Sequence, residues 1–256
     1  MSGAAEAAAG PLFDIRLAAS EADIQAVQRL RYEVFVAELG ADGPMVDHAA
    51  RLERDAFDPS CDHLMLIDRA SGALVSVYRL MRDDQAAAFG RFYTEAEYDV
   101  ASLRASGRRL LELGRSCTAA AWRGGPAMLV MWNALAAYVL ERGIEILFGT
   151  ASFHGTDPAA IAAPLSLLHH DHLAPPELRP RSRGFQPMDL LPAAALDRRA
   201  ALAALPPLIR GYLRLGGRVG EGAFIDRAFN TIDVCMVVDT ARMSARHREF
   251  YSRSRG

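Results

Sequence analysis

The segment Leu110-Leu-Glu-Leu-Gly-Arg-Ser-Cys-Thr118 is an apolar run that contains one acid, Glu112, and one base, Arg115, with a glycine between them. Its apolar character predicts a buried strand of the central sheet. Charged side chains are almost never fully buried unless they are paired. Glu112 and Arg115 are therefore candidate catalytic residues, not packing residues.

A glycine-rich turn, Trp122-Arg-Gly-Gly-Pro126, follows this strand, and the apolar run 126–140 after the turn predicts a helix. Strand, glycine-rich turn and helix together present backbone N–H groups and a helix N-terminus to an anion. Arg123, Gly124 and Gly125 are therefore candidates for binding a phosphate group.

The composition is that of an ordinary globular protein. The chain has 256 residues, of which 51% are hydrophobic and 23% charged, and its formal net charge of −2 gives no support for a nucleic-acid partner. All 29 cationic side chains are arginine, so functions that need a catalytic or phosphate-binding lysine are excluded. Three distant cysteines predict reduced thiols of a cytoplasmic protein, not a disulfide framework or a zinc site.

Strands that alternate with helices predict an α/β (α+β) fold with a mixed central sheet flanked by helices. We expect residues 1–10 to be disordered and residues 11–256 to form a single domain, in which 170–230 is a lid or subdomain. Residues 1–10 lack the features of a signal peptide, and no run of about 18 apolar residues predicts a membrane span. The predicted strands cover 12–18, 63–68, 73–82, 110–118, 144–150 and 231–239, and the predicted helices cover 20–35, 126–140, 157–168 and 196–215, the last broken at Pro206-Pro207.

Three histidines, His169, His170 and His172, lie at the end of the predicted helix 157–168. Within four consecutive positions they cannot all converge on one ion without a bent backbone. We favour a polar helix end or a contact with substrate over a metal site. We therefore expect neither a metal nor a cofactor.

Further charges interrupt otherwise apolar segments. Alone, each would be interpreted as a solvated residue at the edge of the core, and Arg31 as a snorkelling arginine. Together their order resembles that of the acyl-homoserine-lactone autoinducer synthases. The matching motifs are Arg31-x-x-Val-Phe35, Glu53-x-Asp55-x-Phe-Asp58, the strand arginine Arg79, and Glu112-x-x-Arg115.

A second resemblance is closer and covers nearly the whole chain. It rests on the blocks Leu30-Arg-Tyr-Glu-Val-Phe35, Phe92-Tyr-Thr-Glu-Ala-Glu97, Glu112-Leu-Gly-Arg-Ser-Cys117, Phe148-Gly-Thr-Ala-Ser-Phe-His-Gly155, Leu168-His-His-Asp-His-Leu-Ala-Pro-Pro176, and Gly211-Tyr-Leu-Arg-Leu-Gly216 with Phe229-Asn-Thr-Ile-Asp-Val234. These blocks resemble the ornithine lipid synthesis N-acyltransferases. The resemblance implies a GNAT-like fold and transfer of a 3-hydroxyacyl group from acyl carrier protein to the α-amine of L-ornithine, which gives lyso-ornithine lipid.

The implied reaction assigns roles to the candidate residues. An α-amino group, with a pKa of about 8, is mostly protonated near neutral pH and must lose a proton before it attacks a thioester. Glu112 is the first candidate for the general base, and it would only position or relay if Arg115 lowers its pKa. Strand amides near Gly114 would hold the oxyanion. We expect Arg31, Arg79 and Arg115 to bind the amino-acid carboxylate, Asp55 and Asp58 to bind its cationic side chain, and Phe35, Phe57 and Trp122 to wall the site.

Other interpretations of these residues stay open. The same charges could form a buried ion network with a structural role. Cys117 could be an acyl-accepting nucleophile, but nothing except Arg115 marks it as reactive, and a small buried residue is the favoured interpretation.

The length of the turn at Arg123 is relevant to which acyl donor the protein uses. The usual GNAT turn for coenzyme A is longer than Arg123-Gly-Gly-Pro-Ala127. A carrier-protein arm brings one phosphodiester, whereas coenzyme A brings a pyrophosphate and a further phosphate, so a reduced cradle is compatible with a carrier-protein donor. The arginines in 179–183 and 242–255 are either solvated or dock an acidic carrier protein or anionic lipid headgroups. We expect a cytoplasmic protein, with peripheral contact to the inner membrane as a further hypothesis.

Two further hypotheses concern function. The same chemistry could serve another amino acid or an autoinducer-synthase-like reaction. A non-enzymatic alternative is an acyl- or lipid-binding module. The retention of six charged residues in the pattern argues against the binding module, because a site that has lost its catalytic function need not keep them.

Overall fold

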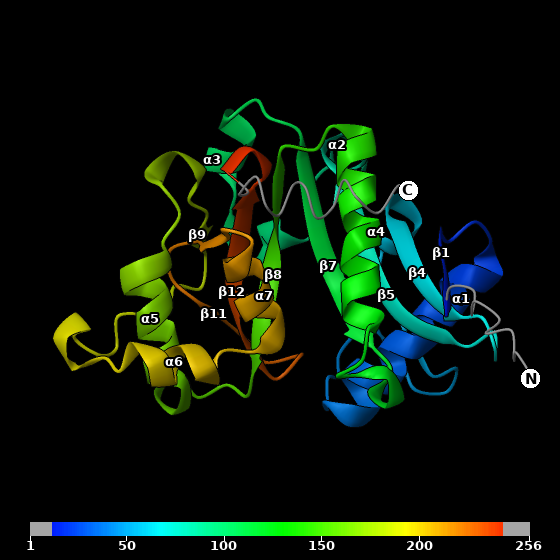
Figure 1. Ribbon diagram of the computed structural model, residues 1–256, viewed down its shortest axis with the longest axis horizontal. Helices are drawn as coiled ribbons and strands as arrows, with labels where there is room; N and C mark the ends of the chain where they lie inside the picture. The colour runs from blue at the N-terminus through cyan, green and yellow to red at the C-terminus, as the bar shows by residue number, and fades with distance from the viewer. Residues whose placement is uncertain (1–11, 243–256) are drawn as a thin grey trace, which may run out of the picture.

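A mixed eight-stranded sheet forms the centre of residues 12–242, the part of the chain that the computed structural model describes (Figure 1). Its strand order is β1-β4-β5-β7-β8-β12-β10, and β11 also pairs with β12. Within it β7 and β8 run parallel, and the other neighbours run antiparallel. The strands are β1 Phe13–Leu17, β4 Asp62–Asp68, β5 Leu74–Arg82, β7 Leu110–Thr118, β8 Ile146–His154, β10 Arg218–Val219, β11 Phe224–Asp226 and β12 Thr231–Asp239, with two small outlying pairs, β2 Val46–Asp47 with β3 Leu52–Glu53 and β6 Tyr98–Asp99 with β9 Arg181–Ser182.

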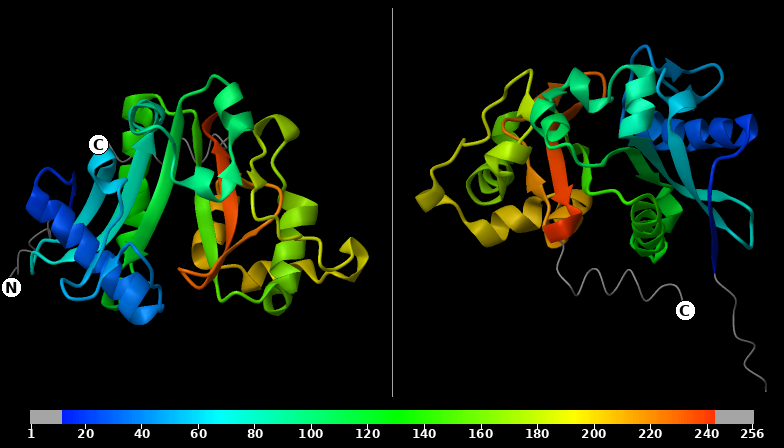
Figure 2. Two further views of the ribbon diagram at one scale, coloured as in Figure 1. Left: turned by 180° about the vertical axis from the view of Figure 1, so that it is seen from behind. Right: turned by 90° about the horizontal axis from the view of Figure 1, so that it is seen from above.

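Helices cover both faces of this sheet, which confirms the predicted fold class. The helices α4 and α7 lie on the face turned to the viewer in Figure 1, and α1 lies on the opposite face, seen in the left panel of Figure 2. The α-helices are α1 Glu21–Arg31, α2 Asp83–Phe89, α3 Ala101–Ala105, α4 Ala127–Arg142, α5 Ala162–His172, α6 Arg198–Ala204 and α7 Pro207–Arg214. Short 3₁₀ turns are η2 Asp58–Ser60, η3 Thr94–Ala96, η4 Ala120–Trp122, η5 Pro158–Ile161, η6 Pro176–Leu178, η7 Ala193–Ala195 and η8 Thr240–Arg242.

The first helix forms as the sequence predicts. The Ser20 side chain accepts a hydrogen bond from the Asp23 N–H, which satisfies one of the open donors at the helix start. Val27 and Leu30 are buried against the sheet. Beyond Arg31 the chain continues as a π-helical stretch, η1 Tyr32–Glu38, and such wide turns frequently occur at functional sites.

The strands β7 and β8 separate partway along their length. They pair only from Leu110↔Ile146 to Glu112↔Phe148, although both continue for several residues. Gly149 lies at the point of separation with a φ of +154°, and a Cβ there would lie 2.1 Å from the carbonyl oxygen of Leu113. Only glycine therefore allows the two backbones to approach so closely before they diverge.

A β-bulge in β7 lies beside this point. Val77 pairs with Cys117 and Arg79 with Gly114, so Tyr78 of β5 faces two residues of β7, Arg115 and Ser116. Arg115 has a φ of 50°, in the left-handed region. An extra residue in a strand redirects the side chains that follow it. The bulge thus places Arg115 on the same face of the sheet as Glu112, and both contact Tyr93.

Several boundaries differ from the sequence prediction. The strand predicted at 144–150 is displaced, because β8 pairs with β12 as far as His154↔Thr231. The helix predicted at 196–215 is two helices, α6 and α7, because Pro206 lacks the N–H that a continuous helix needs.

The segment 170–230, expected to be a lid or subdomain, contributes β10 and β11 to the main sheet and Ile209 and Tyr212 to the main hydrophobic core. Residues 1–10, which we expect to be disordered, lie outside the described residues, and so does the arginine-rich end 243–256.

Candidate active site

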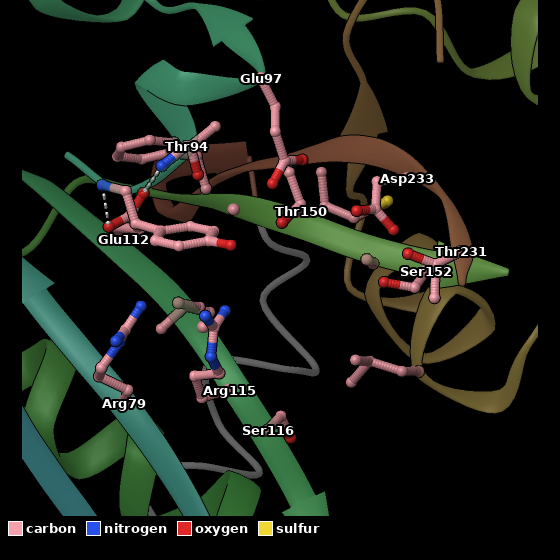
Figure 3. A pocket seen from close by; sticks show the side chains of 18 of the residues that line it. Arg79, Thr94, Glu97, Glu112, Arg115, Ser116, Thr150, Ser152, Thr231 and Asp233 are labelled. Atoms are coloured by element: carbon pink, nitrogen blue, oxygen red, sulfur yellow. Dashed lines mark hydrogen bonds between the residues drawn. The ribbon is translucent and has the colours of Figure 1, made fainter. Parts of the chain in front are cut away.

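A pocket of about 240 Å³ occupies the space between the separated strands (Figure 3). Toward η3 its wall is charged, and toward α7 it is apolar. Such a pocket suits a substrate that has both ionic groups and an apolar chain. The charged lining residues are Arg79, Glu97, Glu112, Arg115, Asp226 and Asp233, and the apolar ones include Leu113, Leu147, Leu208, Tyr212, Met236 and Val238.

A buried ion network supports the charged wall. Arg31 pairs with Glu53 and, at 2.7 Å, with Asp58. Arg79 reaches Asp55 at 2.7 Å and Asp58 at 3.1 Å. The third arginine, Arg115, pairs with Glu53 and Asp55 at 3.1 Å each. The charges of three arginines and three acids thus balance one another away from water. This balance stabilises charges that would be very costly to bury singly.

The members of the network differ in their access to the pocket. Arg31 and Asp58 are almost completely buried and do not line the pocket, so they hold the other members in place. Arg79 and Arg115 line it. Arg79 makes its ion pairs through Nη1, while a Cβ at Gly114 would lie 3.9 Å from its Nε and Nη2. Nε and Nη2 therefore lie next to Gly114, which also lines the pocket.

Glu112 lies at the start of the separation and is 4% exposed. Its two oxygens accept hydrogen bonds from the backbone N–H groups of Thr94, at 2.6 Å, and Tyr93, at 3.0 Å. Burial raises the pKa of this carboxyl group above its usual range, although the Thr94 hydrogen bonds oppose the shift. A raised pKa makes a carboxylate a better proton acceptor near neutral pH.

A second group of acids, which the sequence analysis does not assign, lines the same pocket. One side-chain oxygen from each of Glu97, Asp226 and Asp233 lies within 4.8 Å of the other two. Glu97 and Asp233 are each 4% exposed, and Oε2 of Glu97 and Oδ1 of Asp233 have no hydrogen-bond partner among the described residues. Burial raises the pKa of Asp233 to about 6 and that of Glu97 well above its usual range. Figure 3 shows both carboxylates over β8 near Thr150.

The sequence contains a signal for this acid cluster. Asp233 interrupts the apolar strand 231–239 in the same way that Glu112 interrupts 110–118. Glu97 and Asp233 also belong to two of the blocks that carry the family resemblance. Glu97 follows η3 and Asp233 lies in β12, so their proximity is a tertiary feature that no local pattern encodes.

The other predicted wall residues lie in different places. Phe35 lines the pocket. Phe57 is buried beneath the Arg79 guanidinium, which lies 5.7 Å from its ring centroid. Trp122 packs edge-on against Phe13, at 5.5 Å between ring centroids, and does not line the pocket.

The predicted phosphate cradle precedes α4. Arg123 forms an ion pair with Glu38, at 2.7 Å through Nη2, and donates from Nε to the Thr118 carbonyl. Gly124 has a φ of +76° and open space around it, and Gly125 follows in the same turn. Arg123 is thus already paired, and the backbone amides of the turn are the groups left for an anion.

Cys117 and the three histidines of the sequence analysis do not line the pocket. Cys117 is buried, and burial raises the pKa of its thiol to about 12, so it is not poised as a nucleophile. His169, His170 and His172 occupy the last turn of α5 and do not line the pocket. Nε2 of His170 lies 2.9 Å from the Leu191 carbonyl oxygen, a contact typical of a polar helix end.

Among residues 12–242, no helix is both long and apolar enough to cross a membrane.

Comparison with known proteins identifies the family. Residues 30–133 match the acetyltransferase (GNAT) domain. The chain is 63% identical to an L-ornithine N(alpha)-acyltransferase of Rhodobacter capsulatus, with 96% of this chain and 97% of that protein covered. It is 42% identical to an L-ornithine N(alpha)-acyltransferase of Brucella abortus, with 93% and 88% covered. Among solved structures, a coenzyme A-dependent acyl-homoserine lactone synthase superposes with a TM-score of 0.49 at 12% identity, over 91% of this chain and 82% of that one.

Identity at this level over nearly the full length of both proteins reflects common descent and a shared catalytic scaffold. The chain is an acyltransferase, and it belongs to the L-ornithine Nα-acyltransferase family.

Proposed function

We propose that this protein transfers a 3-hydroxyacyl group from acyl carrier protein to the α-amine of L-ornithine, forming lyso-ornithine lipid. The observation that carries the proposal is the pocket between β7 and β8, which combines a charged wall with an apolar end. The names of the two relatives support the choice of acceptor.

In this proposal the acceptor carboxylate lies against Arg79 and Arg115. Both line the pocket, and the Nε–Nη2 edge of Arg79 takes no part in its ion pairs with Asp55 and Asp58. Arginine binds carboxylates through such an edge with two parallel hydrogen bonds. Asp55 and Asp58, expected to bind the acceptor side chain, instead hold these arginines in place.

Glu112 then acts as the general base. It accepts a proton from the α-ammonium group, and the neutral amine attacks the thioester carbonyl carbon. The C–N bond forms, the C–S bond breaks, and of the two protons that the amine loses, one ends on the thiol sulfur and the other passes to solvent. Strand amides near Gly114, where β7 has left β8, would bind the oxyanion of the tetrahedral intermediate.

The acyl chain would occupy the apolar end of the pocket. This end lies between the sheet and α7, where Leu208 and Tyr212 face Met236 and Val238 of β12. The thioester would then lie between the separated strands, within reach of the amine on the charged side. Binding from opposite faces of the sheet brings two chemically different substrates together without overlap.

A carrier-protein donor agrees with the turn before α4. Arg123 is paired with Glu38, so it offers little free positive charge to the several phosphates of coenzyme A. Amides of the turn and of the α4 N-terminus suffice for the single phosphodiester of a carrier-protein arm.

The donor class is tested by comparing one 3-hydroxyacyl group on acyl carrier protein and on coenzyme A, with L-ornithine as acceptor. We expect the carrier-protein donor to give the higher kcat/KM. A clear preference for coenzyme A would contradict this part of the proposal.

Peripheral membrane contact belongs to the same proposal, because the product is a single-chain amphiphile. Met128, Leu129 and Leu140 of α4 are each more than half exposed, which is unusual for large apolar side chains. Binding to anionic vesicles at low salt that is lost at high salt would support the contact. No binding to such vesicles at low salt would remove it.

A further inference from the structure

We propose that Glu97, Asp226 and Asp233 bind the side-chain ammonium group of the acceptor and so select a cationic amino acid. This inference rests on the proposed function, which it deepens by assigning the residues that determine acceptor specificity. Glu97 directly follows η3, Asp226 ends β11 and Asp233 lies in β12, and the three acids meet in the pocket that also contains Glu112 and Arg115.

The charge balance of the pocket calls for a cation. Arg31, Arg79 and Arg115 are matched by Glu53, Asp55 and Asp58 in the ion network. None of Glu97, Asp226 and Asp233 forms an ion pair with a residue of the described range 12–242. Three ionised carboxylates so close together in a largely buried site repel one another, and a bound cation removes that repulsion.

Two of these carboxyl groups carry unused acceptor atoms. Oε2 of Glu97 and Oδ1 of Asp233 are buried without a hydrogen-bond partner in the described structure, and both residues line the pocket. Native proteins rarely leave buried polar atoms unpaired, so a ligand, an ion or an ordered water is expected to complete such a site. Asp226 is held in position, because its Oδ1 accepts the N–H groups of Ala228 and Phe229.

The arrangement also matches the three ionic groups of a diamino acid. The carboxylate has Arg79 and Arg115, the α-amine has Glu112, and the side-chain ammonium has the three acids. With an ordinary pKa of about 10, a side-chain ammonium stays protonated where an α-amine, at about 8, can lose its proton. The acids would hold the side-chain amine charged, so that the α-amine is the one that attacks.

The charged side chains near Glu97 and Asp233 also support this assignment. Arg115 is the cation whose field favours the ionised forms of both Glu97 and Asp233, while Glu112 and Asp226 oppose ionisation of Glu97. An ammonium ligand would add the positive charge that the cluster lacks. A divalent cation is the competing occupant, and the experiment below distinguishes the two.

The test compares L-ornithine with L-norvaline, which has the same carbon chain but lacks the side-chain amine. The kcat/KM for each acceptor is measured with saturating 3-hydroxyacyl carrier protein for the native protein, Glu97→Gln and Asp233→Asn. We expect the native preference for ornithine to fall by about 100-fold in each variant, chiefly through a higher KM for ornithine. The KM for the acyl donor is expected to stay unchanged.

Asp68→Asn is the matched control, because Asp68 is also a buried acid but lies at the hairpin between β4 and β5, outside the pocket. It is expected to leave the ornithine-to-norvaline ratio unaltered. A second readout needs no variant: ornithine should raise the Tm of the native protein more than norvaline does.

The possible outcomes distinguish the acid-cluster assignment from the proposed function on which it rests. If the native protein acylates ornithine but the variants lose kcat/KM equally for ornithine and norvaline, only the acid-cluster assignment is overturned. Native protein that fails to acylate ornithine but acylates a neutral amino acid would overturn the proposed function. Activity abolished by EDTA and restored by Mn²⁺ would assign the cluster to a metal ion and contradict our inference.

Discussion

Glu112 illustrates how one side chain can serve both structure and chemistry. Its oxygens accept the N–H groups of Tyr93 and Thr94, which fixes η3 over the pocket, and each oxygen keeps a further lone pair. Burial raises its pKa, so the carboxylate can accept a proton near neutral pH while still holding η3. The same residue therefore couples the wall of the pocket to the proposed proton transfer.

Glu112→Gln should lower kcat by about 10²-fold or more, because an amide cannot take the amine proton. Turnover is measured by release of free thiol, and donor binding by titration with 3-hydroxyacyl carrier protein. Donor binding is expected to persist. In the native protein, kcat/KM should fall as the pH drops through the raised pKa of Glu112, since protonation removes the base. A variant with native turnover would exclude the base role.

Asp233→Asn should stabilise the protein at alkaline pH, at the expense of function. The pKa of Asp233 rises from 3.8 to about 6 on folding, so ionisation costs the folded state about 3 kcal/mol at a pH above 6, at about 1.4 kcal/mol for each pKa unit. That cost disappears as the pH falls toward 3.8, and the advantage of the variant should shrink accordingly. Thermal unfolding at pH 8 and pH 5 measures this, and a variant less stable than the native protein at pH 8 would contradict it.

At the scale of elements, the separation of β7 from β8 creates the site. Two features of the backbone produce it: the close approach at Gly149 and the bulge at Arg115. Before the bulge, Glu112 faces η3, and the bulge turns Arg115 toward that same side. A regular strand would direct residues 112 and 115 to opposite faces.

Gly149→Ala tests the close approach. Its Cβ would lie 2.1 Å from the Leu113 carbonyl oxygen, so the strands must move apart, and we expect a loss of about 1–3 kcal/mol or more of unfolding free energy. Gly114→Ala is the control on the facing strand, where the nearest atoms would lie at 3.9 Å, and its Tm should stay near the native value. Equal Tm values for both variants would show that the close approach is not required.

The helix α7 forms one wall of the apolar end, and Leu208 is its partly buried lining residue. Leu208→Trp should shorten the acyl chain that the pocket accepts, because the indole fills space that the chain would occupy. The ratio of kcat/KM for a long over a short 3-hydroxyacyl donor is expected to fall about 10-fold or more. An unchanged ratio would place the acyl chain elsewhere.

At the scale of the whole molecule, the buried ion network joins α1, β3, the segment 55–58, β5 and β7 into one body. Removing one partner of a buried ion pair commonly costs about 3–5 kcal/mol, because the remaining charge is left uncompensated. Arg31→Met should therefore lower the Tm strongly, although Arg31 does not line the pocket. Any folded fraction should keep the native KM for ornithine, and a KM raised at full stability would instead indicate direct substrate contact.

The sequence was sufficient for some features and not for others. The strand 110–118, the mixed sheet and the family were predicted correctly, because apolar periodicity and ordered motifs are local properties. The bulge at Arg115 was not predicted, since it depends on the register between β5 and β7. Asp55 and Asp58 were expected to receive the acceptor side chain, yet they are paired with arginines. Glu97 and Asp233, which form no ion pair among the described residues, lie far apart in the sequence and meet only in the pocket of the folded chain.

The most direct test of the account incubates the purified protein with long-chain 3-hydroxyacyl carrier protein and a panel of amino acids. The panel contains L-ornithine, lysine, glutamine, glycine and S-adenosylmethionine, and the lipid-soluble product is identified by mass spectrometry. We predict α-N-(3-hydroxyacyl)ornithine as the dominant product. Product from a neutral acceptor in preference to ornithine, or no product from any acceptor with an intact donor, would contradict the account.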